Sequence, residues 1–394
     1  MRNKNILIVS QYFDPENFRI NELYRKLLKN SCHVDVITCK PSYPDKNQYE
    51  NTQINIKNIY RTFTFRRNKN SNISIILNYL FYLSGIIYII LFLRSKKYDC
   101  IFCYQPSPVT SGSVSLFAAY FFKCKSIIWV QDLWPEALFN NYNKKYIFYY
   151  FIEWVSLIIY KKHNYILCQS KSIVKKLETK LPSKNILYMP NFCEDEYRYL
   201  RNIQLSKKIK NGKKTFVFAG NLGSSQNLEF IISAFEKVSN DSYEFDLLII
   251  GDGRNKRKIE EIKDKKNMNF LKLFGSCSIQ EICKFYEKAD FMVLSLKSGI
   301  GNDITIPGKL QSYLMAGIPI LGSINGETNI IVNQHNLGKC ADANDQDLLI
   351  KNIKELININ QAQYNMMVNN CINYYDKNFD ILNCLNILKG IINE

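Results

Sequence analysis

Short β-branched runs alternate with helical patterns along nearly the whole chain, and this alternation limits the possible folds more than any other feature. It is typical of βαβ units that build a parallel sheet. The runs form two series, one over residues 6–10, 34–38, 99–104, 126–131, 165–169 and 186–189, the other over 215–220, 245–251, 270–275, 291–296 and 318–323. The sequence therefore predicts an α/β fold with two Rossmann-like domains facing a cleft.

A polar and basic stretch, residues 198–214, separates the two series and is predicted to be a linker. The 394 residues are enough for two domains with full hydrophobic cores. We expect a first domain over residues 1–197 and a second over residues 215–360. Residues 361–394 are polar and helical in pattern, and we expect this segment to return to the first domain.

The chain is strongly basic. Lys and Arg number 52 against 35 Asp and Glu, which gives a formal net charge of +17. Such a charge favours a negative partner: nucleic acid, an anionic membrane surface or a phosphorylated substrate. The sequence carries no helix-turn-helix, zinc-finger or RNA-binding signature, so nucleic acid is not expected as a partner.

The 12 cysteines are scattered. Only Cys100 and Cys103 form a CxxC pair, inside a run that is typical of a buried strand, and no second pair completes a zinc site. Many unpaired thiols favour a reducing compartment. The first apolar run is too short for a signal peptide, so the protein is predicted to be cytoplasmic.

Residues 73–93 carry no charge and are long enough to span a bilayer. A span would separate the runs at 6–10 and 34–38 from the run at 99–104, although all three look like neighbours in one sheet. The segment is therefore either an apolar helix packed on that sheet or a helix that dips into the membrane interface. We favour the second, because the aromatic stretch 146–160 lies in the same half. Lipid headgroups would then meet Arg66, Arg67, Lys69, Arg94, Lys96 and Lys97.

Several cofactor and metal sites are excluded by what the motifs lack. No glycine precedes the helix after the first strand, so NAD and FAD are not expected in the first domain. No Walker motif is complete. Asp345 and Asp347 form a DxD that is predicted to open a helix, where acidic residues are favourable, and no metal is expected. The three histidines are isolated, so no His-based triad is visible.

Two loops have the features of an anion site. Gly220, Asn221 and Gly223 follow a strand and lead into a helix, so backbone N–H groups are exposed there. The alternative is a simple tight turn. In the second loop Pro307 fits the first position of a helix, which leaves Lys309 beside the positive end of the helix dipole. We interpret Lys309 as a phosphate ligand; the alternative is a surface lysine. Both loops predict a site for phosphate chemistry.

Gly326 and Glu327 follow the next strand of the second series. Glu327 could offer a carboxylate to sugar hydroxyls; the alternative is a turn followed by an acidic residue that starts a helix.

Together these elements resemble the retaining glycosyltransferases of family 4, which have the two-domain GT-B fold. Within that family they look most like the branch of bacterial O-antigen and capsule enzymes that includes L-fucosamine transferases. The resemblance covers nearly the whole chain. It is carried by SQYFDPENFRINEL (10–23), WVQDLWPEAL (129–138), FAGNLGSSQNLE (218–229), GDGRNKRKIE (251–260), ADFMVLSL (289–296) and IPGKLQSYLMAGIPILGSINGE (306–327).

The resemblance implies a UDP-sugar donor on the second domain and an acceptor on the first, often a sugar on a membrane-embedded polyprenyl diphosphate. It implies no metal. Lys309 would stabilise the leaving diphosphate, and Asp132 would orient the donor sugar or the acceptor hydroxyl, unless it only caps the next helix. Glu16 and Arg19 would shape the acceptor side, and the protein would be peripheral on the cytoplasmic membrane face. The remaining donor-side residues are Gly220, Asn221, Gly223, Gly275, Ser276, Ser312, Gly326 and Glu327.

The chain departs from the family at five positions. Thr305 and Ser312 stand where two glutamates are common, and Ser312 can hydrogen-bond a ribose hydroxyl but brings no charge. Asn221 and Gln226 replace a usual Arg and Lys. Gln131 stands where many members have a His and cannot act as a base.

Two rival functions remain. A nucleotide-sugar epimerase on the same fold would need acid and base groups around the sugar, and few histidines are available. A non-catalytic basic protein that binds membranes would need none of the donor-site residues.

Overall fold

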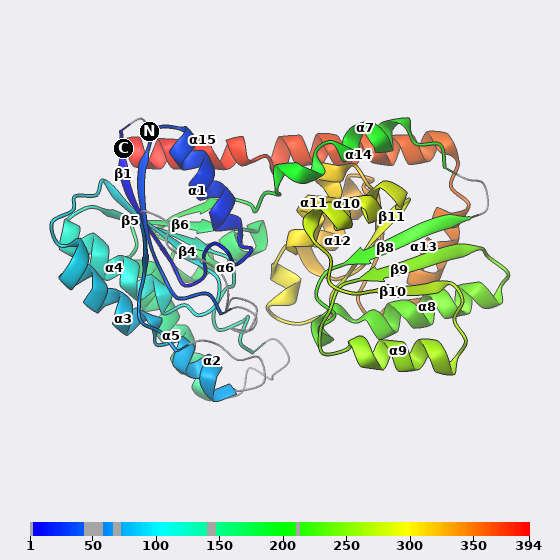
Figure 1. The fold of residues 1–394 in the computed structure, drawn as a ribbon, viewed down its shortest axis with the longest axis horizontal. Helices are drawn as coiled ribbons and strands as arrows, with labels where there is room; N and C mark the ends of the chain where they lie inside the picture. Colours follow the sequence, from blue (N-terminus) through cyan, green and yellow to red (C-terminus); the bar gives the residue numbers. More distant parts are fainter. Residues whose placement is uncertain (1–2, 43–57, 66–71, 140–146, 210–212) are drawn as a thin grey trace. The chain divides into compact units, whose positions relative to one another are not determined.

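The computed structural model describes residues 3–42, 58–65, 72–139, 147–209 and 213–394. The chain divides into two compact units (Figure 1). Unit 1 comprises residues 1–190 together with 381–394, and unit 2 comprises residues 191–380. Each unit is built on its own parallel sheet.

Unit 1 contains a seven-stranded parallel sheet in the order β3-β2-β1-β4-β5-β6-β7. Six of its strands lie at the predicted runs. The seventh, β3, is a three-residue edge strand that the sequence pattern did not predict. The bounds are β1 Asn5–Ser10, β2 His33–Thr38, β3 Ile59–Arg61, β4 Cys100–Gln105, β5 Lys125–Val130, β6 Tyr165–Cys168 and β7 Asn185–Tyr188.

Helices cover both faces of this sheet. One face carries a layer of α3, α4 and α5, in which α4 packs against both neighbours (Figure 1). Two glycines allow the close approach, because a Cβ at Gly85 would lie 3.0 Å from Val114 and a Cβ at Gly112 would lie 2.6 Å from Ile159. The bounds are α1 Arg19–Lys29, α2 Asn72–Asn78, α3 Phe81–Tyr88, α4 Ser111–Phe122, α5 Ile147–Lys162, α6 Lys171–Lys180 and α15 Ile381–Asn393.

The apolar segment 73–93 is interrupted rather than one helix. It begins within α2, turns at Tyr79 and Leu80, continues as α3 and ends in a π-helical turn, Ile89–Leu93. Phe81, Ile89 and Leu93 are buried against β1 and β4, so one side of the segment belongs to the core. In the part of the chain that the structure describes, no helix is both long and apolar enough to cross a bilayer.

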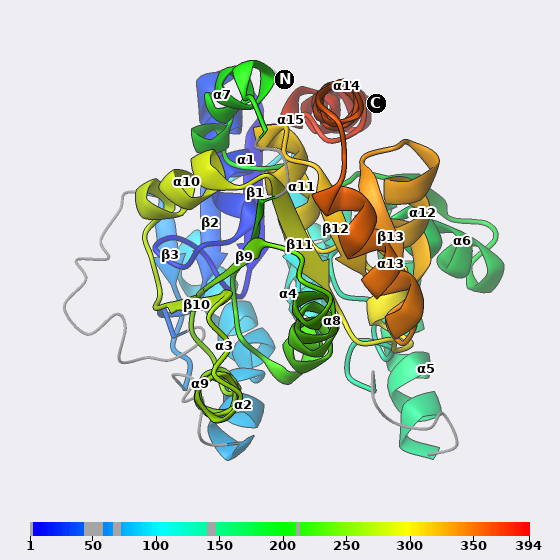
Figure 2. The same cartoon turned by 90° about the vertical axis from the view of Figure 1, so that its right-hand side faces the viewer.

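Unit 2 contains a six-stranded parallel sheet in the order β10-β9-β8-β11-β12-β13 (Figure 2). Five strands lie at the predicted runs, and β13 was not predicted. The bounds are β8 Lys214–Ala219, β9 Phe245–Ile250, β10 Leu271–Phe274, β11 Phe291–Ser295, β12 Ile320–Ser323 and β13 Gly338–Ala341.

Two hydrophobic clusters fill the two sides of this sheet, one under α10, α11 and α12 and the other under α8, α9 and α13. The segment predicted as a linker carries α7, which packs on α10 and α14. Of the C-terminal segment, α14 packs on unit 2 and α15 belongs to unit 1. The bounds are α7 Leu200–Ser206, α8 Leu228–Asn240, α9 Lys256–Lys265, α10 Ile279–Lys288, α11 Gly308–Ala316, α12 Gly326–Gln334, α13 Gln346–Ile357 and α14 Gln361–Asn378.

The predicted fold class, an α/β chain with two Rossmann-like domains built on parallel sheets, is confirmed.

Candidate functional site

The strand order of unit 2 reverses between β8 and β11, which are adjacent although β9 and β10 come between them in sequence. In open α/β sheets, ligands bind outside the carboxyl ends of the strands at such a reversal. The loops that follow β8 and β11 meet at this point, because the Lys297 N–H donates to the Ser225 carbonyl at 2.8 Å. This switch point is the candidate site of unit 2.

Glycine is required in the two neighbouring loops after β8 and β9. Gly220 has φ +139° and Gly251 has φ +140°, both in the region that favours glycine. A Cβ on Gly251 would lie 1.9 Å from the Gly220 carbonyl oxygen. The Leu222 N–H donates to the Asp252 carbonyl at 2.8 Å and holds the loops together. The backbone at this edge is therefore tightly packed and unobstructed by side chains of its own.

Lys309 reaches into this glycine loop from the first turn of α11. Its Nζ lies 3.7 Å from the centroid of the Phe218 ring and donates to Gln226 Oε1 at 2.6 Å. A Cβ on Gly220 would lie 2.6 Å from Lys309 Cε, so the lysine occupies the space that the glycine leaves open. Pro307 is the N-cap of α11 rather than its first residue, which places Lys309 second in the helix.

The ammonium of Lys309 has no counter-charge within the described part of the chain. In the described residues no carboxylate forms an ion pair with it. Loss of hydration lowers the pKa of Lys309 to about 7, because burial disfavours the charged form. A cation at the positive end of a helix is also electrostatically unfavourable. An anion bound here would relieve both costs, so the arrangement is suited to a phosphate group.

The other predicted residues of unit 2 lie at the same edge of the sheet. Asn221 is exposed and Gly223 half-buried in the loop after β8. Gly275 and Ser276 are exposed after β10, and a Cβ on Gly275 would meet nothing within 4 Å. Ser312 is buried, and its hydroxyl donates to the Lys309 carbonyl at 2.9 Å.

Gly326 and Glu327 open α12. Gly326 has φ +72°, and a Cβ there would lie 1.8 Å from the Asp303 carbonyl oxygen, so the loop after β11 packs on the start of this helix. Glu327 is half-buried in its first turn.

In unit 1, Asp132 follows β5 at the carboxyl edge of the sheet and is half-buried. Its Oδ2 accepts a hydrogen bond from Ser107 Oγ at 3.1 Å, and Ser107 Oγ in turn accepts one from Trp134 Nε1 at 3.0 Å. Burial raises the pKa of Asp132, and the Ser107 hydrogen bond opposes that rise. Asp132 is therefore a carboxylate held in place by its neighbours.

Glu16 and Arg19 lie near the carboxyl end of β1. Glu16 is fully buried, and its two carboxylate oxygens accept from the backbone N–H groups of Phe13 at 3.1 Å and Ser42 at 2.9 Å. It therefore orders the loop after β1. Arg19 is the first residue of α1 and is half-buried. Three of the predicted headgroup contacts, Arg66, Arg67 and Lys69, lie outside the described residues.

Sequence reasoning missed Phe218, Ser107 and Trp134. Phe218 lies within β8, at the start of the FAGNLGSSQNLE motif, and was given no role. Ser107 follows β4, and only the rule that carboxyl ends of neighbouring strands meet would have paired it with Asp132 after β5. Trp134 was part of a quoted motif but carried no role.

Other candidates have structural roles. Asp345 is the N-cap of α13, as predicted, and accepts from the Leu348 N–H at 2.9 Å. The cysteines Cys100 and Cys103 are buried and free. His163 is fully buried between Ser115 and the Ile159 carbonyl, and burial lowers its pKa to about 4. The described residues contain no cluster of three or more His, Cys, Asp or Glu that could hold a metal ion.

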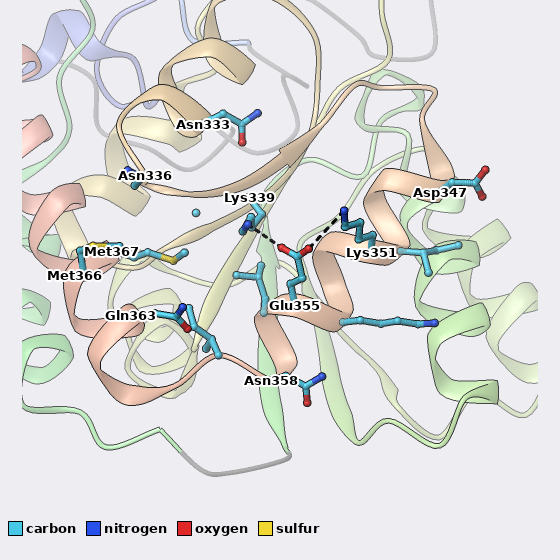
Figure 3. Close-up of a pocket in the computed structure, with 15 residues that line it drawn as sticks. Asn333, Asn336, Lys339, Asp347, Lys351, Glu355, Asn358, Gln363, Met366 and Met367 are labelled. Atoms are coloured by element: carbon cyan, nitrogen blue, oxygen red, sulfur yellow. Dashed lines mark ion pairs between the residues drawn. The ribbon is translucent and has the colours of Figure 1, made fainter.

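A pocket of about 860 Å³ lies elsewhere in unit 2, among α12, β13, α13 and α14 (Figure 3). Its polar lining includes Glu355, which pairs with Lys339 at 2.8 Å and with Lys351 at 4.0 Å. The pocket is next to the amino end of β13, whereas the glycine loops and Lys309 lie at the carboxyl edge of the sheet. The candidate site of unit 2 is therefore the carboxyl edge of its sheet and not this pocket.

Comparison with known families matches residues 201–374 to the model described as glycosyl transferases group 1. The matched stretch is less than half of the 394 residues. That match spans most of unit 2, including the glycine loops and Lys309.

Two relatives agree with this assignment. A glycosyltransferase of Methanocaldococcus jannaschii, MJ1178, is 26% identical over 195 residues, which are 49% of each chain. The Escherichia coli protein WcaI, provisionally named a colanic acid biosynthesis glycosyl transferase, is 23% identical over 155 residues, 38% of this chain and 37% of the relative. The matched stretches thus span about half or less of these relatives.

Solved structures match over nearly the whole chain. Sucrose-phosphate synthase from Thermosynechococcus elongatus has a TM-score of 0.74 at 14% identity, with 99% of this chain and 98% of that one covered. Anabaena HepE in complex with UDP has a TM-score of 0.67 at 12% identity, with 99% and 100% covered. The fold is thus the GT-B fold.

Proposed function

We propose that the protein transfers a sugar from a UDP-sugar to a lipid-linked saccharide during bacterial surface polysaccharide synthesis. The donor sugar is an N-acetylated amino sugar such as N-acetyl-L-fucosamine, the reaction retains the anomeric configuration, and no metal takes part. The observation that carries the proposal is the position of Lys309 beside the Gly220 loop, where no carboxylate of the described residues pairs with it.

The donor side of the proposal rests on unit 2. The diphosphate would lie against Lys309 and the backbone N–H groups of the Gly220–Gly223 loop. The open space at Gly275 and the exposed Ser276 would accept the uracil base. Ser312 would face the ribose and Glu327 the sugar hydroxyls. The UDP bound in Anabaena HepE, a protein of the same fold, supports this choice of nucleotide.

The reaction breaks the bond between the anomeric carbon and the diphosphate oxygen and forms a bond from that carbon to an acceptor oxygen. UDP leaves with the electron pair of the broken bond. The acceptor hydroxyl transfers its proton to a phosphate oxygen of the leaving group, so the protein need not supply a base. Negative charge grows on the diphosphate, and Lys309 would stabilise it. The transition state resembles an oxocarbenium ion, as in glycoside hydrolysis.

The acceptor side is assigned to unit 1. Asp132, held by Ser107, would orient the acceptor hydroxyl or the donor sugar. Glu16 and Arg19 would shape this side through the loop after β1 and the start of α1. The acceptor would be a saccharide on a polyprenyl diphosphate, and the protein would be peripheral on the cytoplasmic face of an anionic membrane. The provisional assignment of WcaI to colanic acid biosynthesis supports a polysaccharide product.

The test is UDP release by the purified protein with a panel of UDP-N-acetylhexosamines, including UDP-N-acetyl-L-fucosamine, and a polyprenyl-diphosphate-linked saccharide. Acceptor-dependent release with one donor supports the proposal and names the donor. A change of the sugar with donor alone would instead show an epimerase. No release and no donor binding would favour a non-catalytic membrane-binding protein.

A further inference from the structure

The layer formed by α3, α4 and α5 leaves a large apolar surface exposed on its outer side. One side of each helix packs into unit 1, while bulky apolar and aromatic side chains stand in solvent on the other. We call this surface the apolar face. It consists of Leu83, Ile87, Ile90, Leu91, Phe92, Tyr120, Phe121, Ile147, Phe148, Tyr150, Phe151 and Trp154.

The spacing of these residues follows the helical period. On α5 the exposed positions Ile147, Phe151 and Trp154 are four and three residues apart, and Trp154 is 61% exposed. On α3, Leu83 and Ile87 are four residues apart, and the opposite side carries the buried Phe81 and, in the following π-helical turn, the buried Ile89. Helix α3 is thus apolar all round, and α5 is mostly so up to its C-terminal lysines, which is typical of helices buried on both sides. None of the described residues covers the outer side of these helices.

A groove runs between α4 and α5 within the same layer. It has a volume of about 650 Å³ and is lined mainly by apolar side chains, with Lys162 among its lining residues. Leu116 and Phe117 contribute from α4, and Ile158 and Ile159 from α5. An apolar groove bordered by a lysine offers contacts for an acyl chain and for an anionic headgroup.

Basic residues gather at the C-terminal ends of these helices. Crossover helices of a parallel sheet run antiparallel to its strands, so these ends lie at one edge of unit 1. Among the described residues, five exposed cations at these ends have no ion-pair partner: Arg94, Lys97, Lys123, Lys161 and Lys162.

Acidic residues are nearly absent from the described helices α2, α3, α4, α5 and the π-helical turn. Glu153 is the single one, and it is paired with Lys180. A partner protein that covered a surface of this kind would need acidic groups set around an apolar centre. An anionic bilayer supplies both over any area, with acyl chains for the apolar residues and phosphates for the cations.

We propose that the apolar face docks on an anionic lipid bilayer, with Phe151, Trp154 and Ile87 inserted at the headgroup–acyl boundary and the five cations on lipid phosphates. This docking would bring a lipid-linked acceptor to unit 1, and in that respect the inference rests on the proposed function. Membrane binding itself requires neither donor nor acceptor, so an experiment can contradict the docking without contradicting the transferase function, and the reverse.

The turn between α2 and α3 connects the apolar face to Asp132. Tyr79 in this turn contacts the Trp134 ring edge-on at 6.3 Å between centroids. Trp134 Nε1 donates to Ser107 Oγ, which donates to Asp132. Leu80, next to Tyr79, is exposed. An acceptor whose lipid lies in the docked bilayer would therefore approach Asp132 past these two aromatic rings.

The experiment is flotation of the full-length protein with phosphatidylcholine vesicles, alone or mixed with phosphatidylglycerol. We expect binding to the mixed vesicles, weaker binding to phosphatidylcholine alone, and loss of binding in high salt. The double variant Phe151→Asp/Trp154→Asp should bind the mixed vesicles at least about tenfold more weakly, because carboxylates replace two aromatic side chains that insert into the bilayer. Lys161→Glu/Lys162→Glu should remove the preference for phosphatidylglycerol.

The matched control is Leu382→Asp on α15. Leu382 is 62% exposed, like Trp154, but lies on a helix outside the α3–α5 layer (Figure 1). It should float like the wild type. Circular dichroism and UDP binding of each variant monitor folding and the donor site separately.

Two results would overturn the proposal. One is equal flotation of the wild type and the Phe151→Asp/Trp154→Asp variant. The other is a wild-type dimer in sedimentation that this variant converts to a monomer, with no flotation of either, which would assign the face to a second copy of the chain.

Discussion

The Lys309 ammonium lies 3.7 Å above the centre of the Phe218 ring, and in the described residues its one side-chain hydrogen-bond partner is Gln226. A neutral ring and an amide do not replace the hydration of a cation that burial has removed. The side chain is thus held in an unfavourable state in the absence of ligand. An anionic ligand would convert this cost into binding, since it would supply the missing charge.

The first prediction concerns stability. Lys309→Met should raise the melting temperature at pH 7, because methionine fills the space over Phe218 without a charge to desolvate. The folded pKa is about 7, below the usual value for lysine of 10.5, so the unfolded chain binds more protons between these pH values and wild-type stability rises with pH there. The advantage of the variant should therefore be largest at or below pH 7 and shrink toward pH 10. Thermal melts of both proteins across this range measure it; an advantage that grows with pH would contradict the assignment.

The second prediction is proton uptake on UDP binding. At pH 8 Lys309 is mostly neutral in the free protein, and a bound diphosphate raises its pKa by favouring the ammonium form. Calorimetry in two buffers with different ionisation enthalpies should show uptake of up to one proton at pH 8 and almost none from Lys309 at pH 6. Equal heats in both buffers at pH 8 would show that this lysine does not titrate on binding.

The third prediction concerns the glycine loop. Gly220→Ala should weaken UDP binding by about tenfold or more, because its Cβ would meet Lys309 Cε at 2.6 Å and its φ of +139° is unfavourable for alanine. Gly390→Ala is the control, since a Cβ on this residue of α15 meets nothing within 4 Å. It should bind UDP like the wild type. Unchanged affinity in Gly220→Ala would exclude this loop from the donor site.

The fourth prediction separates a functional Asp132 from a helix cap. Ser107→Ala removes the hydrogen bond that opposes the burial-raised pKa of Asp132. If ionised Asp132 orients a reactant, the acid limb of kcat/KM should move to higher pH, while activity near pH 8 falls less. The exposed Ser206→Ala serves as control. A uniform loss at every pH would assign Ser107 and Asp132 a purely structural part.

The alternation of strands and helices predicted both sheets because a parallel sheet buries its strands as continuous apolar runs. The two strands it missed, β3 and β13, are short edge strands, Ile59–Arg61 and Gly338–Ala341, which lack such a run. The break in the apolar segment 73–93 was also not visible, because Tyr79 and Leu80 are no helix breakers. That turn is set by tertiary contacts, including the hydrogen bond from Gln11 to Asn78 at 2.8 Å.

The glycine loops and Lys309 could be predicted from local sequence, because a strand, a glycine turn and a helix start are contiguous in the chain. The partners of Lys309 could not be predicted in this way, because Gln226 is 83 positions away and Phe218 lies on β8, far from α11 in sequence. The link from Tyr79 through Trp134 and Ser107 to Asp132 likewise joins three separate loops of unit 1. Side-chain partners of this kind follow from the sheet order rather than from any local pattern.

The most direct test of the donor site is a calorimetric titration of UDP into the wild type and into Lys309→Met at pH 7, after both are shown to be folded. Removing one hydrogen-bond donor to the developing charge typically costs about 2.7–4 kcal/mol of stabilisation in a transition state, and a somewhat smaller loss is expected for a ground-state complex. We predict saturable binding to the wild type and at least about tenfold weaker binding to the variant. Equal affinities, or no binding of UDP to the wild type, would contradict the account.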